Sequence, residues 1–297
     1  MPVEVENQTI THCPICFERV RFRYSIRRFT PAFEILRCPA CHLEMQAVIP
    51  RNPVNLYDAE YYSGRAEYSY RDERSREQFD RYVWNARLKH IRKFIPPPAD
   101  FCDVGCAFGG LVAAAQDAGY RARGLDISPY AVAAGRERGL DLRTGMLEPE
   151  ALPSKSVDVL TMIEVFEHLP DPQSAMRALS AAVRPGGLVV IQTANFQGRQ
   201  ARRAGADYHY YLPGHFFYYS THNLRLLFNR FGFNEIHFFR PVEFGLLPKL
   251  LKSRGDFQSA SDYLRWLRIA WYHYSGKLAW GDYSHTSSMV MYALKNR

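Results

Sequence analysis

The stretch CDVGCAFGG, residues 102–110, decides the fold, because its three glycines join a buried apolar segment to a helical one. The segment DFCDVG, residues 100–105, has the short apolar pattern of a buried strand. The segment LVAAAQDAG, residues 111–119, has the pattern of a helix that ends at its glycine. Glycine permits a sharp turn and lets a ligand approach the backbone. These residues therefore predict a strand, a ligand-binding turn and a helix.

Strand-like and helix-like segments alternate along the chain from this stretch onwards. The further strands are expected at residues 121–128, 140–145, 157–165, 188–195, 234–240 and 287–295. The helices between them are expected at residues 128–139, 171–187 and 220–233, each beginning at Ser or Asp. Alternation of this kind predicts an α/β fold, in which helices cover both faces of a doubly wound, mainly parallel sheet.

The acids around the glycine turn indicate the kind of ligand. Asp126 ends the second strand 21 residues after Gly105, where a carboxylate can accept both hydroxyls of a ribose. The turn has the spacing G-x-x-x-G, whereas a dinucleotide site has G-x-G-x-x-G. Asp103 before the turn repels phosphate and suits an ammonium group. The pattern therefore favours S-adenosylmethionine over a nicotinamide dinucleotide, and a dehydrogenase is the weaker alternative.

Four cysteines form two pairs near the N-terminus. Cys13 and Cys16 are separated by two residues, as are Cys38 and Cys41, and 21 residues lie between the pairs. Two such knuckles place four thiolates around one tetrahedral ion, which predicts a structural zinc site in a zinc ribbon over residues 1–50. Four cysteines close the coordination shell, so the site is expected to stabilise the fold and not to catalyse. Two disulfides are the alternative.

Composition and charge place the chain in a broad class. The chain has 297 residues, 47% of them hydrophobic, and a net charge of +8. No apolar stretch approaches the 18 or so residues of a membrane span, and the N-terminus has no signal-peptide pattern. A cytoplasmic location is therefore expected. The excess of basic residues lies in residues 1–95 and 241–297. It suits an anionic partner such as RNA or a phosphorylated substrate, and the alternative is that these side chains form an ordinary solvated surface.

The remaining segments divide the chain into three parts. Residues 51–98 are expected to form a Tyr-rich connector and a helix, and residues 99–297 the main domain. An insertion at 241–286 is apolar, aromatic and basic, which fits a lid, a homodimer surface or a membrane-facing patch. Between the cysteine pairs, Val20, Phe22, Tyr24 and Ile26 alternate with arginines, which predicts a strand with one buried face.

Several motifs together resemble those of class I S-adenosylmethionine-dependent methyltransferases. They are DVGCAFGG, GLDIS, LPSKSVDVLTMIEVFEHLPDP and RPGGLVV. The resemblance is greatest to the group that contains ubiquinone-biosynthesis O-methyltransferases, whose members often carry an N-terminal zinc ribbon and a Tyr-rich connector. It covers roughly residues 10–240 and the last strand. It implies a Rossmann-like, seven-stranded sheet whose last strand is antiparallel.

The resemblance also implies a set of donor-binding residues. These are Asp103, Gly105, Ala107 and Gly109 around the methionine part, Asp126 at the ribose, Ile127, Met146 and Leu147 around the adenine, and Glu164 near the methyl group. Many relatives have an aspartate near the adenine amine, where this chain reads GMLE at residues 145–148. Backbone groups are expected to make that contact here.

Three histidines are candidates for the acceptor side. In relatives, the segment matching residues 207–220 folds over the substrate, so the resemblance implies that His215, and then His209, acts as a base or substrate ligand. His168 in EHLPDP also recurs in such proteins. The alternatives are that His168 is a helix-cap or core residue and that His215 only holds its loop in place.

The function expected from these features is methyl transfer from S-adenosylmethionine to a small molecule or a sugar unit, with oxygen favoured as acceptor. A zinc-containing rRNA or tRNA methyltransferase is an alternative, because zinc modules also occur there and an arginine face at residues 19–28 fits phosphate. A sugar C-methyltransferase is another. A binding protein with a vestigial fold is a further alternative, against which the intact Asp103 and Asp126 argue.

Overall fold

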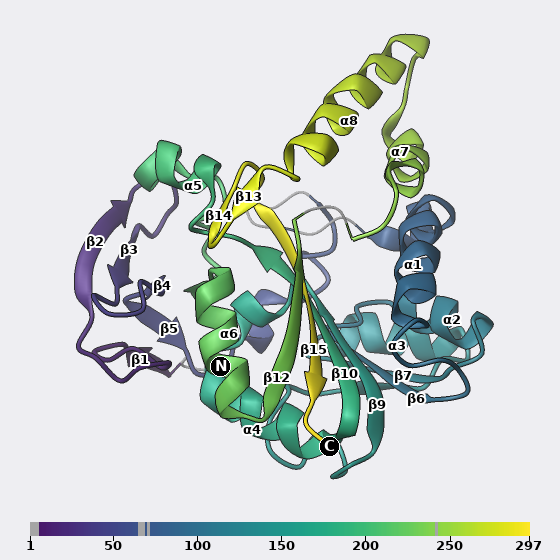
Figure 1. Ribbon diagram of the computed structural model, residues 1–297, viewed down its shortest axis with the longest axis horizontal. Helices are drawn as coiled ribbons and strands as arrows, with labels where there is room; N and C mark the ends of the chain where they lie inside the picture. Colours follow the sequence, from purple (N-terminus) through teal and green to yellow (C-terminus); the bar gives the residue numbers. More distant parts are fainter. Residues whose placement is uncertain (1–5, 65–68, 70–71, 241–242) are drawn as a thin grey trace.

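The computed structural model describes residues 6–64, 69, 72–240 and 243–297, and its centre is a seven-stranded sheet (Figure 1). Across the sheet the order is β12, β15, β10, β9, β6, β7, β8. The strands span, in chain order, β6 Asp100–Val104, β7 Arg121–Asp126, β8 Leu142–Thr144, β9 Val157–Ile163, β10 Val183–Ala194, β12 Phe233–Phe239 and β15 Ser288–Lys295. β15 is antiparallel to both neighbours, and the other pairings are parallel. The predicted Rossmann-like sheet with an antiparallel last strand is confirmed.

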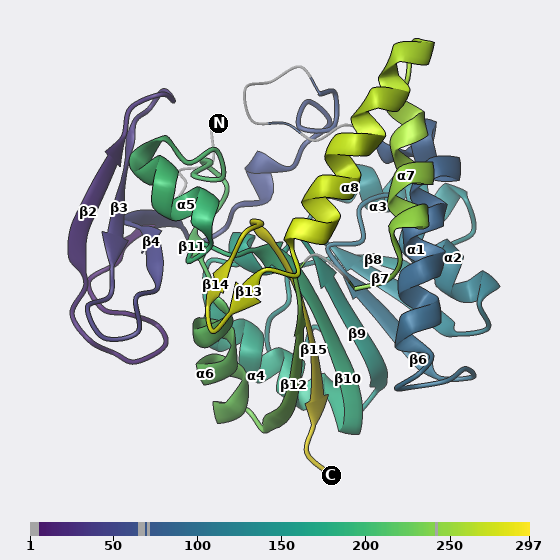
Figure 2. The same cartoon turned by 45° about the horizontal axis from the view of Figure 1, so that its top comes forward.

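Helices cover both faces of this sheet (Figures 1 and 2). One face carries α1 Glu77–Ile91, α2 Gly110–Asp117 and α3 Pro129–Glu137, and the other carries α4 Pro172–Ala182 and α6 Thr221–Arg230. Each face has its own hydrophobic core, one around Leu88, Leu111 and Val132, the other around Leu179 and Phe228. The two cores hold the sheet between the helix layers, so the carboxyl ends of the parallel strands form one edge of the domain.

The N-terminal residues form a small β module beside the sheet (Figure 2). Its strands are β1 Asn7–Thr9, β2 Arg21–Ile26, β3 Phe33–Arg37, β4 Glu44–Gln46 and β5 Val48–Pro50. Its main sheet has the order β11, β4, β3, β2. The strand β11, Phe217–Tyr218, comes from a much later part of the sequence and pairs with β4. Leu43 and Met45 also belong to the same core as α4 and α6. The module is therefore built into the larger domain through both backbone pairing and apolar contact.

The strand between the cysteine pairs differs in part from its expected pattern. Ile26 is 1% exposed, as predicted, but Phe22 is 60% exposed. The pairing of β2 with β3 has a register shift between Phe22 and Tyr24, and such a bulge turns the side chains before it to the other face. The expectation of a buried Phe22 is therefore wrong.

The segment after β12 forms a protruding pair of helices. They are α7 Leu246–Ser253, which packs beside α1, and α8 Arg265–Ser275, which projects from the domain (Figure 1). Leu267 and Trp271 on α8 are each 72% exposed. Residues 241–242 of this expected insertion, 65–68 and 70–71 of the expected connector and 1–5 of the expected ribbon lie outside the described residues. Whether the insertion serves as a lid, a dimer surface or a membrane patch stays a prediction.

The remaining elements are short. They are α5 Arg199–Ala204, β13 Ala279–Trp280 and β14 Tyr283–Ser284, and the 3-10 turns η1 Val54–Leu56, η2 Glu73–Arg76, η3 Phe166–His168, η4 Gly205–Asp207, η5 Arg254–Asp256 and η6 Ala260–Leu264. Within the part of the chain that the structure describes, every helix is too short or too polar to cross a membrane.

Candidate active site

The turn after β6 is shaped by three residues in the left-handed region. Gly105 has φ +74°, Ala107 +46° and Gly109 +81°. A Cβ on Gly105 would lie 2.2 Å from Cγ2 of Val165, so only glycine fits beside the turn that follows β9. A Cβ on Gly109 would lie 2.6 Å from Cδ1 of Leu140, which shows that Gly109 serves helix packing. The turn brings the backbone close to the ends of β7 and β9.

Asp126 is held rigidly by this turn. The backbone N–H of Ala107 donates to its Oδ2 at 2.7 Å, and the N–H of Ser128 donates to its Oδ1 at 2.8 Å. The carboxyl group is buried, and burial raises its pKa above the ordinary value. Each oxygen retains a further lone pair, so the group can accept two more hydrogen bonds, as a ribose diol requires.

Asp103 lies deeper, near the end of β6. The Thr161 hydroxyl donates to its Oδ1 at 2.5 Å, and the residue is 5% exposed. The pKa of Asp103 is raised to about 7, mainly by burial and also by the nearby charge of Asp126, although the Thr161 hydrogen bond acts to lower it. Among the residues that the structure describes, no ion pair joins Asp103 to a cation, and such a buried carboxyl is suited to a ligand that brings its own positive charge.

A cavity of about 440 Å³ lies at this edge of the sheet, a volume within the usual range for small-molecule sites. Ten of the predicted site residues line it: Asp103, Gly105, Ala107, Asp126, Ile127, Met146, Leu147, Glu164, His168 and His215. Tyr57, Tyr61 and Tyr62 of the connector also line it. The structure therefore brings the predicted donor residues and two of the three histidines to one cavity.

Two of the predicted site residues lie apart from the cavity. Gly109 is buried at the start of α2, where it packs against Leu140. His209 is exposed, and its ring contacts those of Tyr208 and Tyr210. Neither residue is among those that line the cavity.

Three side chains lie close together beside the cavity, and we call them the His–Glu cluster: Glu167, His168 and His215. His168 and His215 line the cavity, and Glu167 does not. One ligand-type atom of each residue lies within 4.8 Å of the other two. Glu167 and His168 belong to the 3-10 turn η3 after β9, and His215 to the loop before β11. The N–H of Phe216 donates to the carbonyl of Glu167 at 2.9 Å, which ties the loop to the turn.

Both histidine rings are oriented by backbone carbonyls. The Nδ1 of His168 lies 2.8 Å from the carbonyl oxygen of Gly214, and the Nδ1 of His215 lies 3.0 Å from that of Tyr210. A carbonyl only accepts, so each Nδ1 carries the proton and each Nε2 carries the lone pair. Burial lowers the pKa of His168 to about 4 and lowers that of His215 well below its usual value, so both rings are neutral near pH 7.

Glu167 was not anticipated from the sequence. Its side chain is 1% exposed, and neither carboxylate oxygen has a hydrogen-bond partner among the described residues. Thr193 and Glu164 lie close enough to influence the pKa of Glu167, which burial raises well above its ordinary value, but neither makes a hydrogen bond of acceptable geometry with it. Its position directly before His168, three residues after Glu164, was the signal in the sequence.

Glu164 is exposed, and a network that leads to a buried ion pair positions it. It has φ +56°, and the Nε2 of Gln192 donates to its Oε1 at 2.6 Å. Arg87 donates to Gln192 and pairs with Glu243, Nη2 to Oε2, at 2.9 Å, with both side chains under 5% exposed. Residues from α1, β10 and the segment after β12 thus hold Glu164 at the cavity wall.

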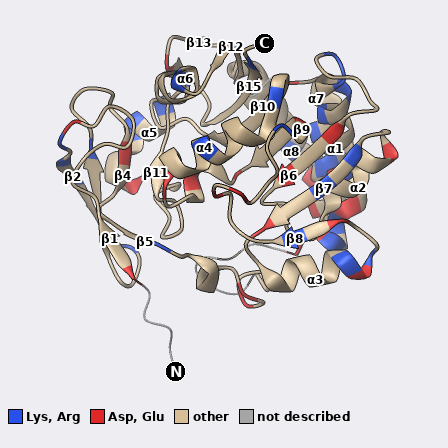
Figure 3. Cartoon of the chain, turned by 90° about the horizontal axis from the view of Figure 1, so that it is seen from below, with Lys and Arg blue, Asp and Glu red and all other residues tan. Residues whose placement is uncertain are grey.

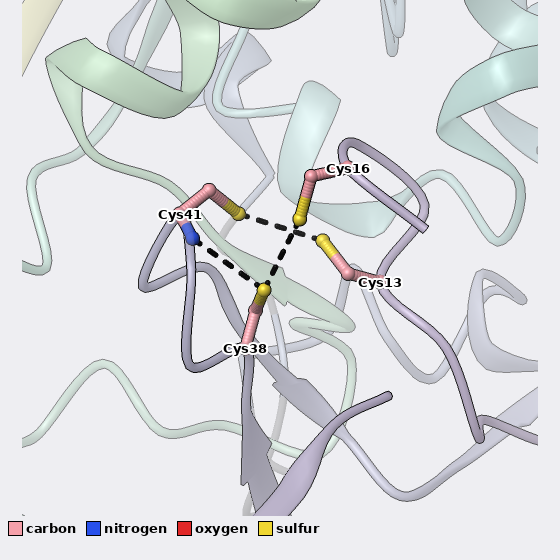
Figure 4. Close-up of side chains that lie close together, drawn as sticks. All are labelled: Cys13, Cys16, Cys38 and Cys41. Carbon is pink, nitrogen blue, oxygen red and sulfur yellow. Dashed lines mark hydrogen bonds between the residues drawn. The ribbon is translucent and has the colours of Figure 1, made fainter. Parts of the chain in front are cut away.

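The four predicted cysteines lie together in the N-terminal module, and we call them the thiolate cluster (Figure 4). The sulfurs of Cys13 and Cys41 are 3.5 Å apart, and those of Cys16 and Cys38 are 3.2 Å apart. All four are free of disulfides. A tetrahedral zinc ion with Zn–S bonds of about 2.3 Å places its sulfurs about 3.8 Å apart. The donor set and its spacing therefore fit a zinc ion and exclude the predicted alternative of two disulfides in this structure.

Comparisons with known proteins agree with this architecture. A family model described as "Methyltransferase domain" matches residues 75–237. The chain is 37% identical over 100 residues to the ubiquinone biosynthesis O-methyltransferase of Cupriavidus pinatubonensis, which covers 31% of this chain and 40% of that protein. It is 36% identical over 118 residues to that of Albidiferax ferrireducens, covering 37% and 47%. The chain thus spans less than half the length of these two relatives.

Two solved structures are also similar. A S-adenosylmethionine-dependent methyltransferase from Archaeoglobus fulgidus has 15% identity and a TM-score of 0.50, covering 74% of this chain and 97% of that chain. A chain from the complex between the Haloferax volcanii Trm112 methyltransferase activator and a putative methyltransferase has 16% identity and a TM-score of 0.51, covering 76% and 95%. At these identities the similarity shows the fold alone.

Proposed function

The chain belongs to the methyltransferase-domain family, and from this premise we propose that it transfers a methyl group from S-adenosylmethionine to an oxygen atom of a small molecule or a sugar unit. The observation that carries the proposal is that Asp103 and Asp126 line one cavity, at the edge where the parallel strands end. Oxygen is the preferred acceptor because the curated relatives are O-methyltransferases by name.

Asp126 is the residue proposed to hold the ribose. Two backbone N–H groups fix its carboxylate, so the oxygens meet a diol without reorganising. Asp103 is proposed to face the ammonium group, and Ile127, Met146 and Leu147 to enclose the adenine. When bound, S-adenosylmethionine supplies a methyl group made electrophilic by the sulfonium.

The acceptor is proposed to enter beside His215 and His168. The neutral His215 can accept a proton from an acceptor hydroxyl. Tyr57, Tyr61 and Tyr62 line the same cavity and are proposed to limit the access of water once both reactants are bound. Alignment of the two reactants supplies much of the rate enhancement in reactions of this type.

We propose a structural role for zinc in the thiolate cluster. The four sulfurs leave no position for a substrate, and the cluster is not part of the cavity lining. Zinc there would fold the N-terminal module, whose strand β4 pairs with β11 next to the loop of His215.

An RNA substrate is less well supported by the arginines of β2 and the following turn. Arg23 pairs with the buried Glu44, Nε to Oε1, at 2.6 Å, and Arg28 donates to the carbonyls of Ala206, Tyr208 and Tyr211. These two side chains are engaged within the protein, whereas Arg19, Arg21 and Arg27 of the same predicted face are exposed. The predicted arginine face is therefore only partly available to phosphate. On the face shown in Figure 3, Lys and Arg are interspersed with Asp and Glu along α1 and its neighbours.

The test of the proposed function is donor binding by calorimetry. Asp126→Ala removes two hydrogen bonds to a charged group, worth about 3 kcal/mol or more together, so the affinity for S-adenosylmethionine should fall at least about 100-fold. Asp141→Ala, which removes an exposed carboxylate on the adjoining loop, should leave the affinity unchanged. Equal affinities in two folded variants would remove the ribose assignment.

A further inference from the structure

We propose that a second cavity, between the N-terminal module and the segment that follows β10, binds the phosphate group of a small phosphorylated molecule. The cavity has a volume of about 350 Å³, which is within the usual range for small-molecule sites. Arg23, Arg37, Arg202 and Glu44 are among the residues that line it. It shares no lining residue with the cavity of Asp103 and Asp126, so the two sites are distinct. We call it the arginine cavity.

Three arginines reach the arginine cavity from separate elements of the chain. Arg23 is in β2, Arg37 is the last residue of β3, and Arg202 is in α5. The helix α5 lies beside the N-terminal module (Figures 1 and 2). Like charges repel, so a fold that brings three guanidinium groups to one cavity favours an anion among them.

Glu44 is the acidic residue of the lining, and both of its oxygens are already engaged. The Nε of Arg23 lies 2.6 Å from Oε1 of Glu44, and the Tyr211 hydroxyl donates to Oε2 at 2.5 Å. The Nη1 of Arg37 lies 3.6 Å from Oε1 of Glu44, which is beyond hydrogen-bond distance. One buried carboxylate therefore satisfies Arg23 and leaves the donors of Arg37 available to a ligand.

Arg202 is also incompletely paired. Its Nη2 donates to Oε1 of Gln197 at 3.4 Å, near the limit of a hydrogen bond, and within the described part of the chain no ion pair includes it. The lining carries three arginines against one glutamate, which is a net charge of +2 with His42 neutral. Burial and the charge of Arg37 both lower the pKa of His42, in keeping with that state. A phosphate monoester carries about −1.5 to −2 at pH 7, so it matches the cavity better than a carboxylate does.

Aromatic rings form another part of the lining. Phe196 and Tyr211 are buried, with ring centroids 5.6 Å apart, and Tyr24 meets Tyr211 edge-on at 6.1 Å. A guanidinium fork can bind two phosphate oxygens at once, and an aromatic wall packs against a ring attached to the phosphate. We therefore expect the cavity to prefer the phosphate monoester of a ring-bearing molecule to phosphate alone.

The arginine cavity adjoins the loop that carries His215. Tyr211 lines the arginine cavity, and the next residue, Leu212, lines the cavity of Asp103 and Asp126. The hydrogen bond from Tyr211 to Glu44 fastens the start of this loop to the module. Binding of a phosphate by Arg37 and Arg202 needs neither the methyl donor nor the acceptor, so the site is tested independently of the proposed function.

The test is calorimetric titration of the full-length protein, loaded with zinc, at low ionic strength. Phenyl phosphate, inorganic phosphate and benzoate are the three probes. We expect one molecule of phenyl phosphate to bind per chain, at least about tenfold more tightly than either of the other two. Inorganic phosphate lacks the ring, and benzoate keeps the ring but carries a single charge. Added NaCl should weaken the binding of phenyl phosphate, because it screens the charges of the cavity.

Two substitutions locate the binding. Arg37→Gln should weaken it at least about tenfold, as should Arg202→Gln, which serves if the first variant does not fold because Arg202 is exposed on α5. The control Arg27→Gln makes the same chemical change at an exposed arginine directly after β2, outside the lining, and should bind phenyl phosphate like the original protein.

Three results would overturn the proposal. The first is no saturable binding of phenyl phosphate, and the second is unchanged binding in folded Arg37→Gln and Arg202→Gln proteins. The third is tighter binding of benzoate, or of a short oligoribonucleotide, than of phenyl phosphate. Phenyl phosphate binding by a protein that binds no S-adenosylmethionine would reject the proposed function and leave the arginine cavity standing as a phosphate site.

Discussion

The thiolate cluster and the His–Glu cluster are two groups of potential metal ligands that lie in different surroundings. The thiolate cluster offers four ligands from two short knuckles, and its coordination shell closes on itself. The His–Glu cluster offers three ligands, and two of them face a cavity of about 440 Å³. A closed shell stabilises a fold, whereas an open one leaves room for a substrate. Removing ligands from each should therefore affect different measurable properties.

The two clusters are connected through one side chain of the module. The Nε2 of Gln46 in β4 lies 2.9 Å from the carbonyl oxygens of Pro213 and His215 and 3.0 Å from that of Leu212. The loop that carries His215 is thus fastened to the module that the cysteines hold together. A change at the thiolate cluster should reach the cavity, and a change at the His–Glu cluster should not reach the module.

The largest effect is expected for Cys38→Ala. Binding of structural zinc supplies about 10–16 kcal/mol of folding free energy in small zinc modules, and the module shares a core with α4 and α6. The zinc content should fall by about one ion per chain, and the melting midpoint should fall by at least about 10 °C in calorimetry. Methyl transfer should also fall, because the Gln46 contacts to the His215 loop depend on the module.

The matched control for this change is Cys102→Ala. Cys102 is also fully buried, but it lies in β6 and is not part of the thiolate cluster. Its loss removes one small apolar group and should cost about 1 kcal/mol with no change in metal content. Equal shifts of the melting midpoint in the two variants would contradict a special role of the thiolate cluster in folding.

The next effect in size is expected for His215→Asn. A general base at this position contributes about 10²–10⁴-fold to turnover, so the rate constant should fall by at least about 100-fold. The donor affinity should change less than about threefold, because the proposed contacts to the donor are made by Asp103 and Asp126 and not by His215. Steady-state kinetics and calorimetry measure the two quantities separately.

His209→Asn is the comparison for this variant, because His209 is exposed and does not line the cavity. Its turnover should remain within about twofold of the original. A larger loss for His209 than for His215 would reverse the order in which the two histidines were predicted to act. A melting midpoint equal to that of the original protein would show that the module is intact in both.

The two clusters also differ in how far the sequence predicts them. The ligands of the thiolate cluster are spaced by two residues within each knuckle, so local geometry alone indicates the site. His168 and His215 are 47 residues apart, and only the pairing of the 216–218 segment with η3 and β4 brings them together. Glu167 was missed because its distinguishing property, burial without a partner, exists only in the folded chain.

The pH dependence of S-adenosylmethionine binding provides a comparison that changes in neither cluster should affect directly. Burial raises the pKa of Asp103 to about 7, so in the free protein this carboxyl is protonated below pH 7 and ionised above it. An ammonium group binds the ionised form. The affinity for S-adenosylmethionine should therefore increase up to about tenfold per pH unit from pH 5 to 7 and level off above pH 7.

Asp103→Asn should flatten this profile and weaken binding above pH 7. Asp100→Asn, at the other end of the same strand, should keep the profile, because Arg121 and Arg184 hold the pKa of Asp100 at about 2. Calorimetry at four or five pH values is sufficient. A steep profile that survives in Asp103→Asn would assign the titration to a different group and remove Asp103 from the donor site.

The fold itself was largely predictable, because hydrophobic periodicity and capping residues are local. Ser128 and Asp171 begin α3 and α4 with side-chain caps, as their positions before proline indicated. The pairing of β11 with β4 was not predictable, since two residues of strand carry no periodic signal. Phe22 was misassigned for a related reason: a bulge shifts the side-chain alternation by one residue, and its position depends on the partner strand.

The smallest effect is expected at Phe22. It tests whether the stability of the N-terminal module depends more on the proposed zinc ion than on the exposed side chains of β2. Phe22 is 60% exposed, so Phe22→Ser should change the free energy of unfolding by less than about 0.5 kcal/mol. Ile26→Ala on the same strand, where the side chain is 1% exposed, should cost about 3 kcal/mol. If Phe22→Ser instead destabilises the protein by more than about 1 kcal/mol, the Phe22 ring is buried against something in solution. A dependence of that free energy on protein concentration would identify a second copy of the chain as the contact. The N-terminal module would then owe its stability to an interface as well as to the thiolate cluster.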